Sequence, residues 1–126
     1  MSGHPIDHKT LFQLMPVPRW IVAVTGDGRY VISEMNDKAR EYLAQGGPLG
    51  PETDLRDILS PDSYRHFEQS FEVAIVQKKP VTIQTVPDFP GGLKVHAFWI
   101  NPVEDQSGRV TLLDIVAQPA AVAPSS

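Results

Sequence analysis

The second half of the chain restricts the fold most, because it predicts three consecutive β-strands. The predicted strands are Val81–Val86, Leu93–Asn101 and Arg109–Gln118, which are rich in β-branched and aromatic residues. Two connections separate them, Pro87–Gly92 (PDFPGG) and Glu104–Gly108 (EDQSG). Their glycine, aspartate and proline residues supply the positive or fixed φ angles that a chain reversal needs. The pattern therefore predicts an antiparallel meander.

The two longer predicted strands are apolar on both faces, in Leu93–Asn101 and again in Arg109–Gln118. A sheet of this kind must be covered on both sides. Helices of the same chain can cover one face. The need for a second cover indicates a module that binds another chain.

The first half predicts a hairpin placed among helices. Gly26-Asp27-Gly28 has the turn chemistry of a hairpin, and Ser60-Pro61-Asp62 is a strong helix start, with an N-cap serine, proline at the first helical position and an acid in the first turn. The predicted elements are a short amphipathic helix at Asp7–Met15, strands at Trp20–Thr25 and Arg29–Ser33, a helix from Asn36, one helical turn at Leu55–Leu59, and a long helix ending at about Gln77.

Length and composition exclude several classes of function. A chain of 126 residues predicts one domain, and the absence of cysteine excludes disulfides, thiol catalysis and cysteinyl chromophore adducts. The net charge of −4, without a basic run, argues against a nucleic-acid partner or an anionic membrane surface. No apolar run approaches a membrane span and no signal peptide is apparent, so we expect a cytoplasmic domain. Its predicted bounds are 7–118, with a disordered N-terminus at 1–6 and a flexible tail or linker at 119–126 that suggests an attached output domain.

The order of elements and several segments resemble the PAS (Per-Arnt-Sim) domain family. The resemblance runs from Leu11 to about Gln118 and depends on the joint order and spacing of short segments: Leu11-Phe12…Met15-Pro16-x-Pro18, Gly26-Asp27-Gly28-Arg29, Asn36-x-x-Ala39…Tyr42-Leu43, Val81-Thr82-Ile83 and Trp99-Ile100-Asn101-Pro102-Val103…Asp105…Gly108. It implies an α+β PAS fold, with a five-stranded antiparallel sheet in the order 2-1-5-4-3, helices on one face and a short N-terminal helix. PAS domains serve as sensory or dimerisation modules of signalling proteins, including two-component systems.

One segment departs from the family. Many PAS domains end their last strand with an Asp-Ile/Val-Thr motif that passes the signal outward. Asp114-Ile115-Val116 looks like this motif but follows Gly108 too closely, which places Asp114 within the strand. We therefore assign no signalling role to Asp114.

The resemblance implies a ligand pocket between the long helix and the inner face of the sheet. In flavin-binding PAS domains the face that corresponds to His96 and Phe98 points into the pocket, so His96 is a candidate polar contact; the alternative is a histidine bonded to a neighbouring backbone group. The predicted ligand-binding residues are Phe67, Phe71, Ile83, His96, Phe98, Ile100, Leu113 and Ile115.

We expect no cofactor. Haem-binding PAS domains take their axial histidine from the C-terminal part of the long helix, whereas His66 lies in its first turns. Flavin photosensors need an Asn-Cys-Arg-Phe-type segment, which the stretch 48–59 lacks. The sequence has no metal-ligand spacing.

Three functions fit these observations. The first is a PAS sensory or dimerisation module that binds a small molecule or partner and has no catalysis of its own. The second is an enzyme of cone-like fold, for which His96 and Asp114 are the only acid–base pair to nominate, although strand alternation puts them on opposite faces. The third is a PAS domain without a ligand, which serves only as a dimer interface.

A homodimer would cover the outer face of the predicted sheet. The N-terminal helix offers Leu11, Phe12, Leu14 and Met15, and Trp99 is the predicted aromatic anchor. The outer-face residues expected from alternation are Val95, Ala97, Trp99, Val110, Leu112 and Val116.

Overall fold

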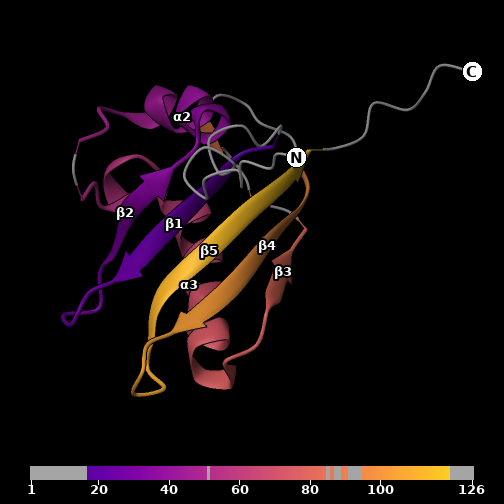
Figure 1. Cartoon of the computed structure of the whole chain (residues 1–126). Coiled ribbons are helices and arrows are strands. Elements are labelled where there is room, and N and C mark those ends of the chain that lie inside the picture. Colours follow the sequence, from indigo (N-terminus) through magenta and orange to yellow (C-terminus); the bar gives the residue numbers. More distant parts are fainter. Residues whose placement is uncertain (1–16, 51, 85, 87–88, 91–94, 120–126) are drawn as a thin grey trace, which may run out of the picture.

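The chain forms one antiparallel sheet with helices on one face, as the computed structural model shows (Figure 1). It describes residues 17–50, 52–84, 86, 89–90 and 95–119; at 95, 96 and 119 it describes the backbone alone. The elements are β1 (Arg19–Val24), β2 (Tyr30–Met35), α2 (Asp37–Leu43), the 3-10 turns η1 (Ala44–Gly46) and η2 (Leu55–Asp57), α3 (Pro61–Gln77), β3 (Val81–Ile83), β4 (Val95–Glu104) and β5 (Val110–Pro119).

The sheet has the strand order β2-β1-β5-β4-β3, so the first and last described strands are neighbours at its centre. Trp20 pairs with Ile115 and Val22 with Leu113 across β1 and β5. Figure 1 shows α3 crossing behind these strands. We call the face toward α3 the inner face and the opposite one the outer face. The predicted fold class and strand order are confirmed; the predicted helix at Asp7–Met15 lies outside the described residues.

Local signals explain where α3 begins and ends. The Ser60 hydroxyl accepts a hydrogen bond from the backbone N–H of Ser63 (3.1 Å), and Pro61 occupies the first helical position. The helix ends at Lys78, which adopts a left-handed conformation with φ of 54°. The Lys78 ammonium also lies 3.4 Å from the Glu104 carboxylate, which joins the end of α3 to the end of β4.

Two predicted strand ends differ most from the structure. The strand predicted to stop at Pro102 continues to Glu104, and Pro102 pairs with Leu113 of β5. On the other side of β4, the pairing with β3 extends only to Ile100, so the missing N–H of Pro102 faces no partner strand there. The strand predicted at Val81–Val86 ends at Ile83.

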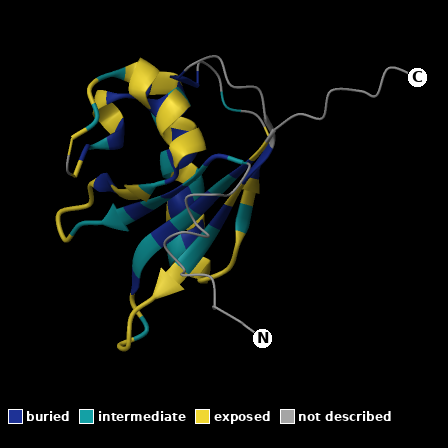
Figure 2. Ribbon diagram, turned by 45° about the horizontal axis from the view of Figure 1, so that its top comes forward, coloured by how far each residue is buried: buried dark blue, intermediate teal, exposed yellow. Residues whose placement is uncertain are grey.

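The core lies between α2, α3 and the inner face, and aromatic rings fill its centre. Figure 2 shows exposed residues at the hairpin tips and buried ones along the strands. The rings of Phe67 and Phe98 have centroids 5.0 Å apart and meet edge to face. This arrangement stabilises the fold beyond what the burial of the two rings contributes. Trp20, on β1, lies within 5.8 Å of Phe98 and 6.3 Å of Phe67. One aromatic cluster therefore joins α3 to two strands of the sheet, β1 and β4.

Asn36 is a fully buried polar residue that connects β1, β2 and α2. Its Oδ1 accepts hydrogen bonds from the backbone N–H groups of Ala39 (2.9 Å) and Arg19 (3.1 Å), and its Nδ2 donates to the carbonyl of Val17 (2.8 Å). Its own N–H donates to the carbonyl of Arg19 (2.9 Å). The side chain thus serves as the N-cap of α2 and also fixes the start of β1.

Replacing Asn36 should destabilise the whole domain. Asn36→Ala removes the side-chain hydrogen bonds to the backbone of Ala39, Arg19 and Val17, which should lower the free energy of unfolding by about 2–4 kcal/mol. Urea denaturation measures the change. Asn36→Asp keeps the acceptor but sets a buried carboxylate oxygen against the Val17 carbonyl, so it should also destabilise the domain. Asn101→Ala, a change of the same type on the outer face, should stay within about 0.5 kcal/mol of the wild type; an equal loss in both alanine variants would contradict the assigned role.

Candidate functional site

The fold brings the predicted ligand-binding residues together on the inner face. Seven of the eight belong to a single buried cluster, each at most 8% exposed. The side chain of His96 lies outside what the structure describes. Whether the eight residues line a ligand cavity stays a prediction. The seven that the structure places in the cluster are Phe67, Phe71, Ile83, Phe98, Ile100, Leu113 and Ile115.

Three further aromatic residues belong to this cluster and were missing from the predicted site. Trp20 lies against Phe89 (5.8 Å between centroids), and Tyr30 lies against Phe71 (4.9 Å). Alternation along β1 would have identified Trp20, since Trp20 and Val22 share the inner face. Phe89 comes from the irregular connection between β3 and β4, where no periodicity marks the inward direction.

Two buried polar atoms near this cluster have no hydrogen-bond partner among the described residues: Trp20 Nε1 and Ser63 Oγ. Ser63 is fully buried and precedes Phe67 by one helical turn, on the same stripe of α3. A buried donor without a partner costs about 1–3 kcal/mol. Both groups are therefore unsatisfied polar atoms beside an apolar cluster.

The outer face combines exposed apolar side chains with an ion pair. Trp99 is 50% exposed and Val103 40% exposed, and across the strands they pair with Val116 and Leu112 of β5. Large apolar side chains exposed on one face are typical of interaction surfaces. The apolar part of this face is therefore centred on the β4–β5 pair.

Arg19 and Asp114 form the ion pair of the outer face. Arg19 Nε donates to Asp114 Oδ1 (2.9 Å) and a second guanidinium nitrogen donates to Oδ2 (2.5 Å), with both side chains mostly buried. The hydrogen bonds to Asp114 raise the pKa of Arg19. Asp114 therefore lies within β5 and faces outward, as alternation predicts, and binds a residue of β1.

The prediction that Val110 belongs to the outer face was wrong. Val110 is 5% exposed and packs into the core. The cause is a register shift between Val103 and Glu104, where Val103 pairs with Leu112 but Glu104 pairs with Val110. Such a bulge reverses the side-chain direction at the end of a strand, so alternation counted from Leu112 fails at Val110.

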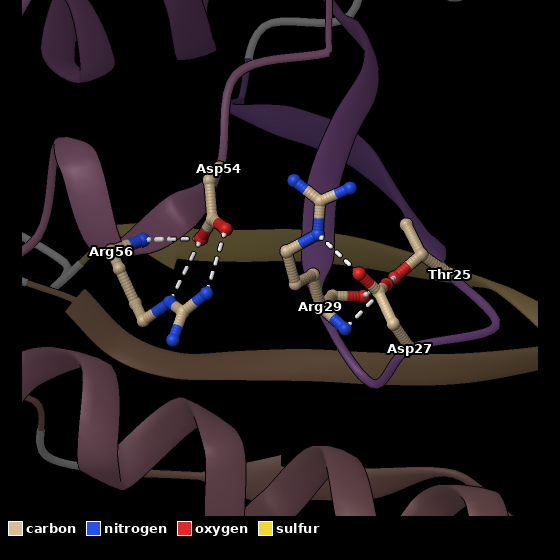
Figure 3. A network of polar contacts seen from close by, with 5 residues as sticks. All are labelled: Thr25, Asp27, Arg29, Asp54 and Arg56. Atoms are coloured by element: carbon tan, nitrogen blue, oxygen red, sulfur yellow. Dashed lines mark hydrogen bonds and ion pairs between the residues drawn. The ribbon is translucent and has the colours of Figure 1, made fainter.

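A polar network lies beside β2, the strand at one edge of the sheet (Figure 3). Asp54 accepts hydrogen bonds from the backbone N–H of Arg56 (2.9 Å) and from its guanidinium (3.2 and 3.4 Å). Next to it, the Arg29 guanidinium donates to Asp27 (3.0 Å), which also accepts from the hydroxyl of Thr25. Asp54 also forms a bridge with Val31 of β2, so this segment covers the strand edge.

The Asp54 carboxyl has a lowered pKa. Burial acts to raise the pKa, but the hydrogen bonds and positive charge of Arg56, with a contribution from the charge of Arg29, outweigh burial. A lowered folded-state pKa means that the carboxylate stabilises the fold above the ordinary aspartate pKa of about 3.9 and that this stability is lost as the pH falls through the folded pKa.

Asp54→Asn should therefore reduce the acid sensitivity of the domain. Compared with the wild type, the variant should be less stable at about pH 7 and should lose less stability between about pH 7 and about pH 3. Urea denaturation at the two pH values gives both quantities. Asp57→Asn alters an exposed acid of the same 3-10 turn and serves as the control. A wild-type pH response in Asp54→Asn would contradict the lowered pKa.

Within the described ranges, no group of three or more histidine, aspartate or glutamate side chains lies close enough to hold a metal ion. None of the helices described is long and apolar enough to cross a membrane.

Comparison with known proteins places the fold. No protein-family profile and no curated protein matches the sequence. Among solved structures, the chain is similar to a crystal structure of a sensory box sensor histidine kinase from Vibrio cholerae, with a TM-score of 0.66 and 14% sequence identity over 90% of this chain and 85% of that chain. At this identity the likeness establishes a shared fold, whose sheet order is the one that the PAS resemblance implies.

Proposed function

We propose that this chain is a PAS-type module of a cytoplasmic signalling protein, that it has no catalysis of its own, and that it acts by pairing with a second copy through the outer face of its sheet. Two observations support a PAS-type module: the strand order β2-β1-β5-β4-β3 and the structural likeness to a sensory box kinase. We choose the outer face as the dimer interface because Trp99 is exposed at the centre of the β4–β5 pair.

A two-fold pairing of this face would bury Trp99 and Val103 against the same residues of the partner. Large aromatic side chains contribute disproportionately to binding energy at such interfaces. The inner face offers a contrast, since its apolar residues already pack within the domain. Under this proposal a signal changes how two sheets pack and so shifts an attached output domain.

The test compares matched substitutions on two surfaces. Trp99→Asp and Val103→Asp place a charge in the proposed contact and should yield monomers in sedimentation velocity, whereas Val76→Asp should leave the assembly unchanged. Val76 is 80% exposed on α3, away from the sheet. A wild type that stays monomeric at high micromolar concentration, or dissociation by Val76→Asp alone, would refute the outer-face dimer.

A second function, sensing of a small polar molecule at the inner face, is favoured by one observation. Trp20 Nε1 and Ser63 Oγ are buried beside the predicted ligand-binding residues without a partner among the described groups. A ligand with a hydrogen-bond acceptor for Trp20 would remove this cost, in a surrounding that is otherwise apolar. The side chains expected to touch it are the eight predicted ones, His96 included.

Ser63→Ala distinguishes an occupied site from an empty one. If the hydroxyl has no partner, alanine removes an unsatisfied group and should leave the free energy of unfolding unchanged or raise it by up to about 1 kcal/mol. If a molecule is bound to the hydroxyl, the same change should destabilise natively purified protein but not protein that was unfolded, dialysed and refolded. Equal destabilisation of both preparations would argue against a ligand contact at Ser63.

The position of Asp114, the acid nominated for the enzyme alternative, gives that alternative little support. Asp114 is bound through both carboxylate oxygens by Arg19 on the outer face. A carboxylate whose two oxygens are both occupied by a guanidinium is poorly placed to act on a substrate. The contact supports a structural role for Asp114, which joins β1 to β5.

A further inference from the structure

A surface hollow beside the first half of α3 is separate from both faces of the sheet. Its volume is about 380 Å³, within the range of small-molecule sites. Positions 61, 64, 65 and 68 share one side of the helix at i, i+3, i+4 and i+7 spacing, while the core stripe holds Ser63, Phe67 and Phe71. The lining residues are Arg56, Leu59, Pro61, Tyr64, Arg65 and Glu68.

One wall of the hollow is held in place by the polar network. The Arg56 guanidinium binds Asp54 and lies over the ring of Tyr64, 6.0 Å from its centroid. Tyr64 is half-buried and Leu59 is buried, so the ring and the aliphatic side chain form an apolar floor. Because Arg56 is already paired, its main effect is to fix the orientation of this ring.

Two opposite charges line the same hollow. The structure gives no ion pair or hydrogen bond to the side chain of Arg65 or of Glu68 among the residues it describes. The pKa of Tyr64 is raised, first by its burial and next by the negative charge of Glu68, so the carboxylate of Glu68 lies within electrostatic reach of the ring. The hollow therefore presents a guanidinium, a carboxylate and an apolar floor to a single ligand.

We infer that this hollow binds a small zwitterion with an apolar side group, of the class of free amino acids with aromatic or branched side chains. Arg65 would bind the ligand carboxylate, for which a guanidinium offers paired donors. Glu68 would accept from the ligand ammonium group. The side group of the ligand would lie on Tyr64, Leu59 and Pro61. The inference does not depend on the outer-face dimer, since no lining residue belongs to the sheet.

Three probe ligands separate the contributions of the ligand's carboxylate and ammonium groups. L-phenylalanine carries both charges, 3-phenylpropanoate lacks the ammonium and 2-phenylethylamine lacks the carboxylate. At millimolar concentrations, L-phenylalanine should shift the backbone amide resonances of Tyr64, Arg65 and Glu68 in a saturable way. The two analogues should bind at least about tenfold more weakly, as expected when one charged hydrogen-bonding group is lost.

Matched variants locate the site. Arg65→Gln and Glu68→Gln should each weaken L-phenylalanine at least about tenfold, and Arg65→Gln should leave 2-phenylethylamine unchanged. Arg40→Gln removes an exposed arginine of α2, outside the hollow, and should have no effect. Since these positions are on the surface, circular dichroism should show wild-type folding. No saturable binding, equal binding of all three probes, or shifts centred on Trp99 or Phe98 instead of the hollow would overturn the inference.

Discussion

The fold depends on one buried asparagine, Asn36, whose hydrogen bonds pair backbone groups where β1, β2 and α2 meet. Asn36 caps α2, holds the N–H of Arg19 at the start of β1 and binds the carbonyl of Val17. Because β1 lies at the centre of the sheet beside β5, its starting point sets the register of the β1–β5 pair. That register in turn places Trp20, Ile115 and Leu113 on the inner face, where they meet the helix. A polar side chain thus determines which residues form the apolar core.

The two faces of the sheet have different compositions because they meet different requirements. On the inner face, aromatic rings from the helix and the sheet pack edge to face. On the outer face, Trp99 stays half exposed while Arg19 and Asp114 neutralise each other between β1 and β5. An ion pair joined by two hydrogen bonds within an apolar surface adds little stability of its own. It does favour partners that leave its charges in water or offer them hydrogen bonds. The outer face is therefore suited to selective contact.

Sequence patterns predicted most of the fold, because the signals were local. Ser60-Pro61 marks the start of α3, and glycine at 28 and 108, with φ angles of 83° and 85°, marks the two hairpin turns. Alternation placed Phe98, Ile100 and Asp114 on their correct faces. Alternation failed at Val110, because a β-bulge depends on how two strands pair and has no marker in the sequence of either strand. The hollow beside α3 was also missed, because Arg56 of the 3-10 turn η2 and Arg65 of α3 line one surface only once the turn packs beside the helix.

The position of the last strand has a mechanical consequence. The N–H of Ala117 donates to the carbonyl of Pro18, so the chain enters β1 next to the place where it leaves β5. Since these strands are antiparallel, tension applied between residues 18 and 117 loads their hydrogen bonds one after another, from one end, in the manner of a zipper. Shear resistance, which requires many bonds to break together, is absent for this direction of pull. A tether on both sides of the domain would therefore open the sheet at its centre under low force, while the hairpin tips stay closed.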